Sequence, residues 1–134
     1  MKELSRSATI TAWLLQVLAA AAFLGAGIPK LAGAPPMVQM FDTIGLGQWF
    51  RYVTGGIEVG SAVLLLVPGA ALFGGFLLAC TMVGAILTHV LVLHTSPATP
   101  IVLLVLVSTI QWLRRGQITA RSSSTPKAVT GGKV

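Results

Sequence analysis

The chain has 134 residues, of which 54% are hydrophobic and 9% are charged, and its mean hydropathy is +0.87. Water-soluble domains carry about 25% charged residues, so this composition excludes an ordinary soluble domain and favours a protein surrounded by lipid. The length suits a single domain. The net charge of +6 does not indicate nucleic-acid binding, because the basic residues gather near the chain ends and no recognition motif is present.

The first predicted element is an apolar helix over Ala8–Ile28. Its length of about 20 residues is what a helix needs to cross a hydrocarbon core of about 30 Å. Pro29 is predicted to end this helix, and Lys30 follows it. A signal peptide cleaved near Ala32–Ala34 is the alternative, but the apolar region exceeds the usual length of about 7–15 residues.

The next segment, Leu31–Arg51, is less apolar and contains Pro35 and Pro36. Apolar side chains stand among polar ones at helical spacing, which predicts a short amphipathic helix lying on the membrane surface. A solvated loop is the alternative. The apolar positions are Met37, Met40, Phe41, Ile44 and Leu46, and the aromatic residues expected at the headgroup level are Trp49 and Tyr52.

Three further apolar spans are predicted, separated by short turns rich in proline and glycine. They cover Arg51–Val67, Ala71–Leu93 and Ala98–Leu113. The predicted fold is therefore an all-α membrane protein, a four-transmembrane-helix bundle with a short amphipathic segment between helices 1 and 2. Residues 1–115 form the transmembrane domain, and residues 116–134 form a basic, disordered cytoplasmic tail.

Four spans place both chain ends on one side of the membrane. Basic residues follow the last span at Arg114 and Arg115 and precede the first at Lys2 and Arg6. Because Lys and Arg favour the cytoplasmic side, both termini are predicted to be cytoplasmic and the segment between helices 1 and 2 to face outward.

Small residues four positions apart are predicted to let helix backbones approach closely. The packing partner is either another helix of the same chain or a second copy in a homodimer. The pairs are Gly56 with Gly60, Gly75 with Ala79, and Cys80 with Gly84. Cys80 is the single cysteine, so the chain lacks the cysteine pair of membrane enzymes that pass electrons between disulfides and quinones.

Glu58 is the one carboxylate inside an apolar span, where an unpaired charge is costly. At 1.5 Å per residue, it lies about 10 Å below the outer interface, and His89 lies about 6 Å deep. Lys30 and Arg51 stand at the outer ends of the first two spans. These four residues are predicted to lie in the outer third of the bundle, as one ligand, proton or quinone-headgroup site or as a structural pair of Glu58 with Lys30 or Arg51.

Other polar residues are weaker candidates. Gln16 and Gln111 are predicted to form hydrogen bonds between helices, and Thr81 and Thr88 to bond to carbonyl groups of their own helix. His89 and His94 are five positions apart and face different sides of one helix, so no metal site is expected.

Three motifs carry a resemblance to a known family. They are Gly27-x-x-Lys30-Leu31 at the end of the first helix, Gly55-x-x-Glu58 in the second, and Met82-x-Gly-Ala-x-x-x-His89 in the third. Over about residues 20–113 the chain resembles the DoxX-like membrane proteins. The resemblance implies a four-helix bundle in the bacterial inner membrane and an association with redox or quinone-linked systems.

The resemblance and the residues lead to three functional hypotheses. The first is a non-catalytic subunit that supports a redox complex and holds a quinone or another small ligand. The second is a small proton-coupled transporter that uses Glu58. The third is a structural or assembly protein without a ligand. In each case the partner is the lipid bilayer, and independent enzyme activity is not expected.

Overall fold

The computed structural model describes residues 6–116, and every secondary-structure element in this range is helical. The all-α prediction is therefore confirmed for the described residues. The predicted tail lies outside them, apart from Gly116. The elements are α1 (Arg6–Ala32), α2 (Pro35–Ile44), α3 (Gln48–Leu65), α4 (Ala71–Thr88), the π-helix η1 (His89–Leu93) and α5 (Ala98–Arg114).

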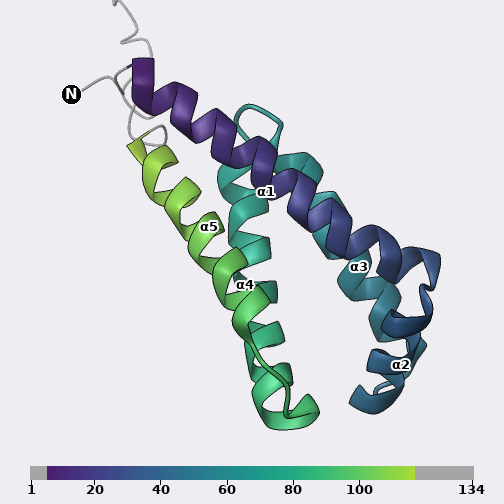
Figure 1. Ribbon diagram of the computed structural model, residues 1–134. Coiled ribbons are helices and arrows are strands. Elements are labelled where there is room, and N and C mark those ends of the chain that lie inside the picture. The colour runs from purple at the N-terminus through teal and green to yellow at the C-terminus, as the bar shows by residue number, and fades with distance from the viewer. Residues whose placement is uncertain (1–5, 117–134) are drawn as a thin grey trace, which may run out of the picture.

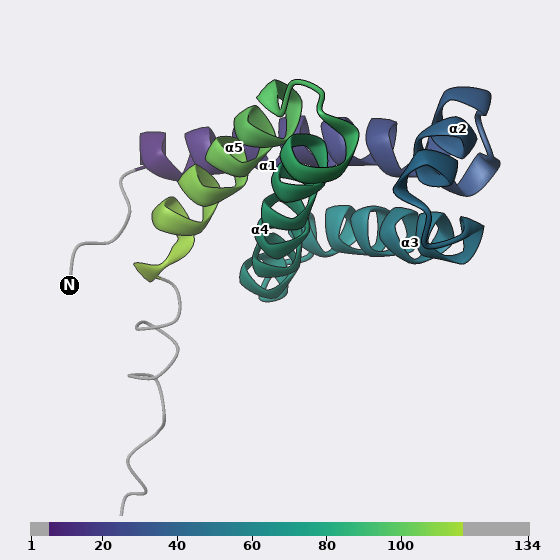
Figure 2. The same ribbon diagram turned by 90° about the horizontal axis from the view of Figure 1, so that it is seen from below.

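The four long helices pack in sequence around a small core. Helix α1 lies along α3, α3 contacts α4, α4 contacts α5, and α5 returns to α1 (Figure 1). The view from below shows the start of α1 and the end of α5 at the same end of the bundle, with α2 at the other (Figure 2). The core is built from small and aliphatic side chains and one phenylalanine: Ala19, Ala20, Phe23, Ala62, Leu65, Leu78, Met82, Val107 and Ile110.

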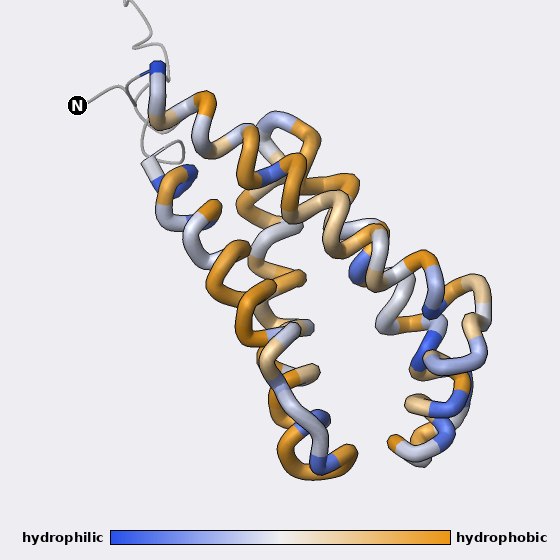
Figure 3. Tube along the Cα trace, in the orientation of Figure 1, coloured by the Kyte–Doolittle hydropathy of each residue, from blue (hydrophilic) through white to orange (hydrophobic). Residues whose placement is uncertain are grey.

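Two apolar helices have the length and composition to cross a membrane. They are Arg6–Ala32 and Ala71–Leu93, and Ala98–Arg114 is a shorter apolar helix. Only 11% of the apolar stretch in Ala71–Leu93 is buried within the protein, so this helix is no ordinary core helix of a soluble domain. Hydrophobic residues dominate α4 and the first half of α5 (Figure 3). This distribution is that of a helical membrane protein.

Helix α1 does not end at Pro29, so the predicted boundary is wrong. The helix continues through Ala32, with Pro29 inside its last turns. Proline removes one amide donor but has a helix-compatible φ, and the end of α1 is stabilised by other contacts. Gly33 adopts φ 73° and the Ala34 amide donates to the Pro29 carbonyl at 3.0 Å, an arrangement that satisfies a terminal carbonyl group.

The predicted short helix before α3 is present as α2. Two prolines occupy its first turn, where their missing amide hydrogens cost nothing, and Gly45 ends it with φ 81°. Phe41 is its buried residue and packs edge-to-face on Phe50 of α3, with ring centroids 5.8 Å apart. Because α2 is anchored by this aromatic pair, its apolar face lies against the bundle.

Most of the glycines predicted to lie at close helix contacts do not lie there, and other glycines make these contacts. A Cβ built on Gly55 would lie 3.0 Å from Lys30 Cβ and 3.1 Å from the Gly27 carbonyl oxygen, so these two glycines bring α1 and α3 together. Gly75 does pack within the chain, against the Gln111 side chain. The predicted glycines Gly56, Gly60 and Gly84 face open space, so they take no part in packing within the chain.

The turn between α3 and α4 forms at Pro68-Gly69, as predicted, with Gly69 at φ 88°. The end of the third span differs from a regular helix. Its last five residues, His89–Leu93, form the π-helix η1, and the Thr95 amide bonds the His89 carbonyl at 2.9 Å. A π-turn widens the backbone locally, and such turns are frequent at functional sites.

Candidate functional site

The centre of the candidate site is an ion pair between Lys30 of α1 and Glu58 of α3. Lys30 Nζ lies 3.1 Å from Glu58 Oε1 and 2.9 Å from Oε2, and it also donates to the Ala26 carbonyl at 3.2 Å. The Glu58 side chain is 3% exposed and that of Lys30 is 13% exposed. Of the two pairings left open by the sequence, the structure contains the one with Lys30.

The glycines of the α1–α3 contact place this pair. Gly27 precedes Lys30 by three residues and Gly55 precedes Glu58 by three, so each glycine shares a helix face with its charged residue. A Cβ on Gly27 would lie 3.2 Å from Glu58 Cβ, which shows how near the two backbones run. A larger residue at either glycine would separate the helices that hold the two charges.

Arg51 does not contact Glu58, although the sequence placed both in one connected site. Its Nη1 donates to the Lys30 carbonyl oxygen, its Nε donates to Gln48 Oε1 at 2.6 Å, and its guanidinium lies 4.3 Å from the Tyr52 ring centroid. The last carbonyl groups of a helix lack intrahelical partners. Arg51 therefore stabilises the end of α1 and forms no bond with the carboxylate of Glu58.

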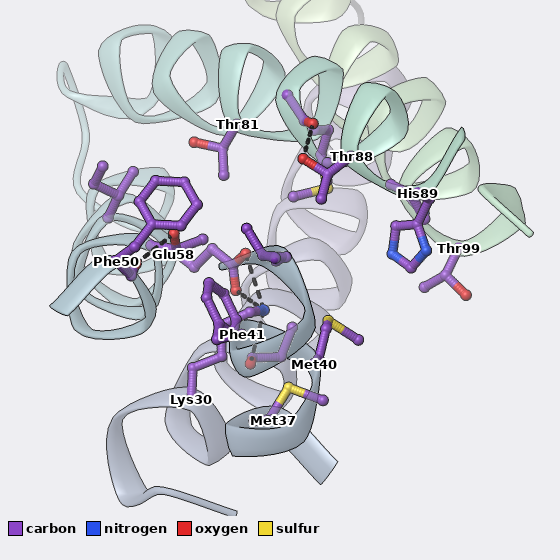
Figure 4. Close-up of a pocket in the computed structure, with 18 of the residues that line it drawn as sticks. Lys30, Met37, Met40, Phe41, Phe50, Glu58, Thr81, Thr88, His89 and Thr99 are labelled. Atoms are coloured by element: carbon purple, nitrogen blue, oxygen red, sulfur yellow. Dashed lines mark hydrogen bonds and ion pairs between the residues drawn. The ribbon is translucent and has the colours of Figure 1, made fainter. Parts of the chain in front are cut away.

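His89 lies on the same cavity as the ion pair but does not bond to it. His89 Nδ1 and Thr95 Oγ1 are 2.7 Å apart, and the tautomer decides which atom donates. In Figure 4 the imidazole stands beside Thr99, away from Lys30 and Glu58. The structure therefore brings three of the four predicted residues to one cavity and puts two of them in direct contact.

The cavity has a volume of about 360 Å³ and receives side chains from every helix of the described chain. Most of its wall is apolar, and the sequence alone had not identified the two phenylalanines as part of it. The main contributors from α2 and α3 are Met37, Met40, Phe41, Ile44, Phe50, Val53 and Ile57, and those from α4 and α5 are Met82, Ala85, Pro100 and Leu103.

A second polar cluster lies at the opposite end of the bundle. Gln16 Nε2 donates to the Leu65 carbonyl, and Arg114 Nε donates to Gln16 Oε1 at 2.7 Å. Gln111 Nε2 donates to the Leu72 carbonyl at 2.7 Å. The predicted interhelical role of both glutamines is confirmed. The role of Arg114 was missed, because a basic residue at a span end was interpreted only as a topology signal.

Comparisons with known proteins agree with the fold and the motifs. The matching family model is described as the DoxX-like family and covers residues 14–110, which include Lys30, Glu58 and His89. The chain is also 34% identical over 85 residues to a Bacillus subtilis (strain 168) protein named "Putative oxidoreductase CatD". That match covers 63% of each protein, so the chain spans less than two thirds of its relative's length. No solved structure matches the chain. With its motifs inside the matched range, the chain belongs to the DoxX-like family.

Proposed function

We propose that this chain is a four-span inner-membrane subunit that holds the headgroup of a quinone-class lipid in its cavity. In this role it supports a redox-linked membrane system without catalysing a reaction by itself. One observation carries the proposal: an apolar cavity with a buried ion pair in its wall. Ligand cavities have volumes of about 300–1,000 Å³ and combine an apolar lining with a few polar groups that orient the ligand.

The lining suits a ring with an apolar tail. Phe41 and Phe50 provide aromatic surfaces, and Met37, Met40 and Met82 provide flexible, polarizable contacts. Glu58 provides a buried polar contact for a ring substituent. A quinone has this combination of an oxygen-bearing ring and a hydrocarbon tail, and it reaches such a cavity from the lipid phase.

The redox link rests on the named relative. The Bacillus subtilis protein bears the name "Putative oxidoreductase CatD", and the shared region covers 63% of each chain. From this relative we propose for the present chain only an association with redox chemistry. The chain's own residues give no candidate electron carrier, because Cys80 is its only cysteine.

Four spans remain part of this proposal. Helices α3 and α5 have 18 and 17 residues. At 1.5 Å per residue they are about 27 and 26 Å long, near the thickness of a hydrocarbon core of about 30 Å. The start of α1 and the end of α5 lie at the same end of the bundle, and α5 ends at Arg114 and Arg115, which supports cytoplasmic termini.

A structural role for the ion pair is the second candidate. The pair joins α1 to α3 beside the close contact made by Gly27 and Gly55, and both charges are largely buried. A lock of this kind needs no ligand. The two candidate roles predict different results for a variant whose cavity is filled and whose ion pair is intact: only the ligand role predicts a loss of bound quinone.

The experiment compares two phenylalanine substitutions on α4. Ala85→Phe fills the cavity, whereas Val83→Phe places the same ring on an exposed position two residues away. The protein is purified in native-lipid nanodiscs and its quinone content is measured by mass spectrometry. We expect quinone in the unaltered protein and in Val83→Phe, and a loss of most of it in Ala85→Phe. Absence of quinone from all three proteins would reject the ligand role and leave the structural one.

A further inference from the structure

The cavity wall near the ion pair has few hydrogens left to donate. Lys30 is the strongest donor there, and an ammonium group has three N–H hydrogens. Its Nζ already has three partners: Glu58 Oε1 at 3.1 Å, Glu58 Oε2 at 2.9 Å and the Ala26 carbonyl at 3.2 Å. A ligand oxygen that only accepts hydrogen bonds would therefore have to displace one of these partners.

Three of the four threonines that line the cavity also have no hydrogen left to donate. A threonine hydroxyl has one hydrogen to donate. Thr54, Thr81 and Thr88 each donate it to the carbonyl four residues earlier in their own helix, at 2.8 Å. Figure 4 shows the bond made by Thr88. The hydrogens of these three hydroxyls are therefore not available to a ligand.

Glu58 has acceptor capacity to spare. A carboxylate has about four lone-pair sites, and Lys30 occupies two of them. No other described residue donates to Glu58 in the structure, so its remaining lone-pair sites have no donor from the protein. Both oxygens already accept from Lys30, and Glu58 lines the cavity, from which a further donor can come.

Charge balance restricts the kind of donor. Because Lys30 neutralises Glu58, a second cation at the carboxylate would meet repulsion from the ammonium group, whereas a neutral hydroxyl would not. The remaining polar groups of the cavity wall, His89 and Thr99, lie away from the pair (Figure 4). The hydrogen bonds that a ligand can form with Glu58 therefore decide which ligand the cavity binds more tightly.

We infer that the cavity selects the reduced, hydroxyl-bearing form of its ligand, a hydroquinone, over the oxidised quinone. The inference rests on the proposed function, since it concerns the same cavity. A hydroquinone hydroxyl donates to a free lone pair of Glu58 and leaves the three bonds of Lys30 intact. A quinone carbonyl offers only an acceptor, and the three hydrogens of Lys30 beside it already have partners. The protein therefore retains the reduced form and releases the oxidised one.

The test measures the affinity of the full chain in nanodiscs for three probes with the same decyl tail. They are a decyl hydroquinone kept reduced without oxygen, the corresponding quinone, and the dimethyl ether of the hydroquinone. A hydrogen bond to a charged acceptor is worth about 1.5–3 kcal/mol, so we expect the hydroquinone to bind about 10- to 100-fold more tightly than either other probe. The ether controls for ring size and redox state.

A paired substitution links the preference to the ion pair. Lys30→Met with Glu58→Leu removes both charges together and keeps the wall apolar, so it avoids an unpaired buried charge. It should bind all three probes with equal affinity. Thr109→Val, at an exposed position outside this cavity, should keep the full preference.

The outcomes separate the inference from the proposed function. Equal binding of hydroquinone and ether by the unaltered protein overturns the inference and leaves quinone-class binding intact. A preference that persists in the paired variant overturns the assignment to Glu58. Failure of all three probes to bind overturns both the inference and the proposed function.

Discussion

Removal of one member of the Lys30–Glu58 pair is expected to destabilise the protein far more than removal of both. Lys30→Met leaves a carboxylate that is 3% exposed, and Glu58→Leu leaves an ammonium group in a side chain that is 13% exposed. Breaking a buried pair costs about 3–5 kcal/mol, because the remaining charge has lost its partner. We expect about 4 kcal/mol for Lys30→Met and about 3 kcal/mol for Glu58→Leu, whose residual charge is the more exposed of the two.

The double variant supplies the decisive comparison. Replacement of a buried pair by apolar residues is often neutral, so Lys30→Met with Glu58→Leu should lie within about 2 kcal/mol of the unaltered protein. The free energy of unfolding is measured by reversible titration with a denaturing detergent. Asp42→Asn is the control, because this carboxylate is exposed and its change should stay within about 0.5 kcal/mol. If the double variant lost the sum of the two single losses, the residues would not be coupled, and the ion pair would have no role in stability.

Two further predictions concern the packing of α3 against α4 and the end of α1. Gly74→Ala should destabilise the protein by about 1–3 kcal/mol, because its Cβ would lie 2.8 Å from the Ser61 carbonyl oxygen. Gly56→Ala, in open space, should instead stabilise α3 by about 0.5–1 kcal/mol. Equal effects of the two changes in the same unfolding titration would refute the close contact at Gly74. Arg51→Lys should speed amide hydrogen exchange over residues 30–34 by about 10-fold. A lysine cannot reproduce both the bond to the Lys30 carbonyl and the bond to Gln48. Unchanged exchange over these residues would mean that Arg51 does not stabilise the end of α1.

The helices were predictable because the information that sets them is local. Long apolar runs interrupted by Pro68-Gly69 and by the turn before Ala98 place α4 and α5 at the predicted positions. Pro29 misled the prediction, since its local effect on the chain is to interrupt a helix. The contacts that extend α1 to Ala32 come from Gly33 and from Arg51, 22 residues beyond Pro29, and no local pattern contains the second of these.

The depth of the site residues in the bundle was predictable from the sequence, but the direction in which each side chain points was not. Counting residues from the span ends placed Lys30 and Glu58 in the outer third of the bundle, and the structure pairs them. The same counting placed Arg51 nearby, but seven residues along one helix are about 10 Å, and the free carbonyl group at the end of α1 lies closer to its guanidinium. The role of Phe41 and Phe50 in the cavity depends on how α2 folds back on α3, which the sequence did not specify.

Pro29 removes one backbone hydrogen bond between the last turn of α1 and the rest of that helix. Its ring nitrogen cannot donate to the Gly25 carbonyl, so one of the bonds that would tie the turn to the body of α1 is absent. The turn is tethered to α3 instead, through the Lys30 side chain and the Lys30 carbonyl. Helix α2 begins three residues after α1 ends and forms one wall of the cavity. Lys30 therefore neutralises Glu58 in the cavity wall and, through its carbonyl group, also fixes the turn that leads into α2.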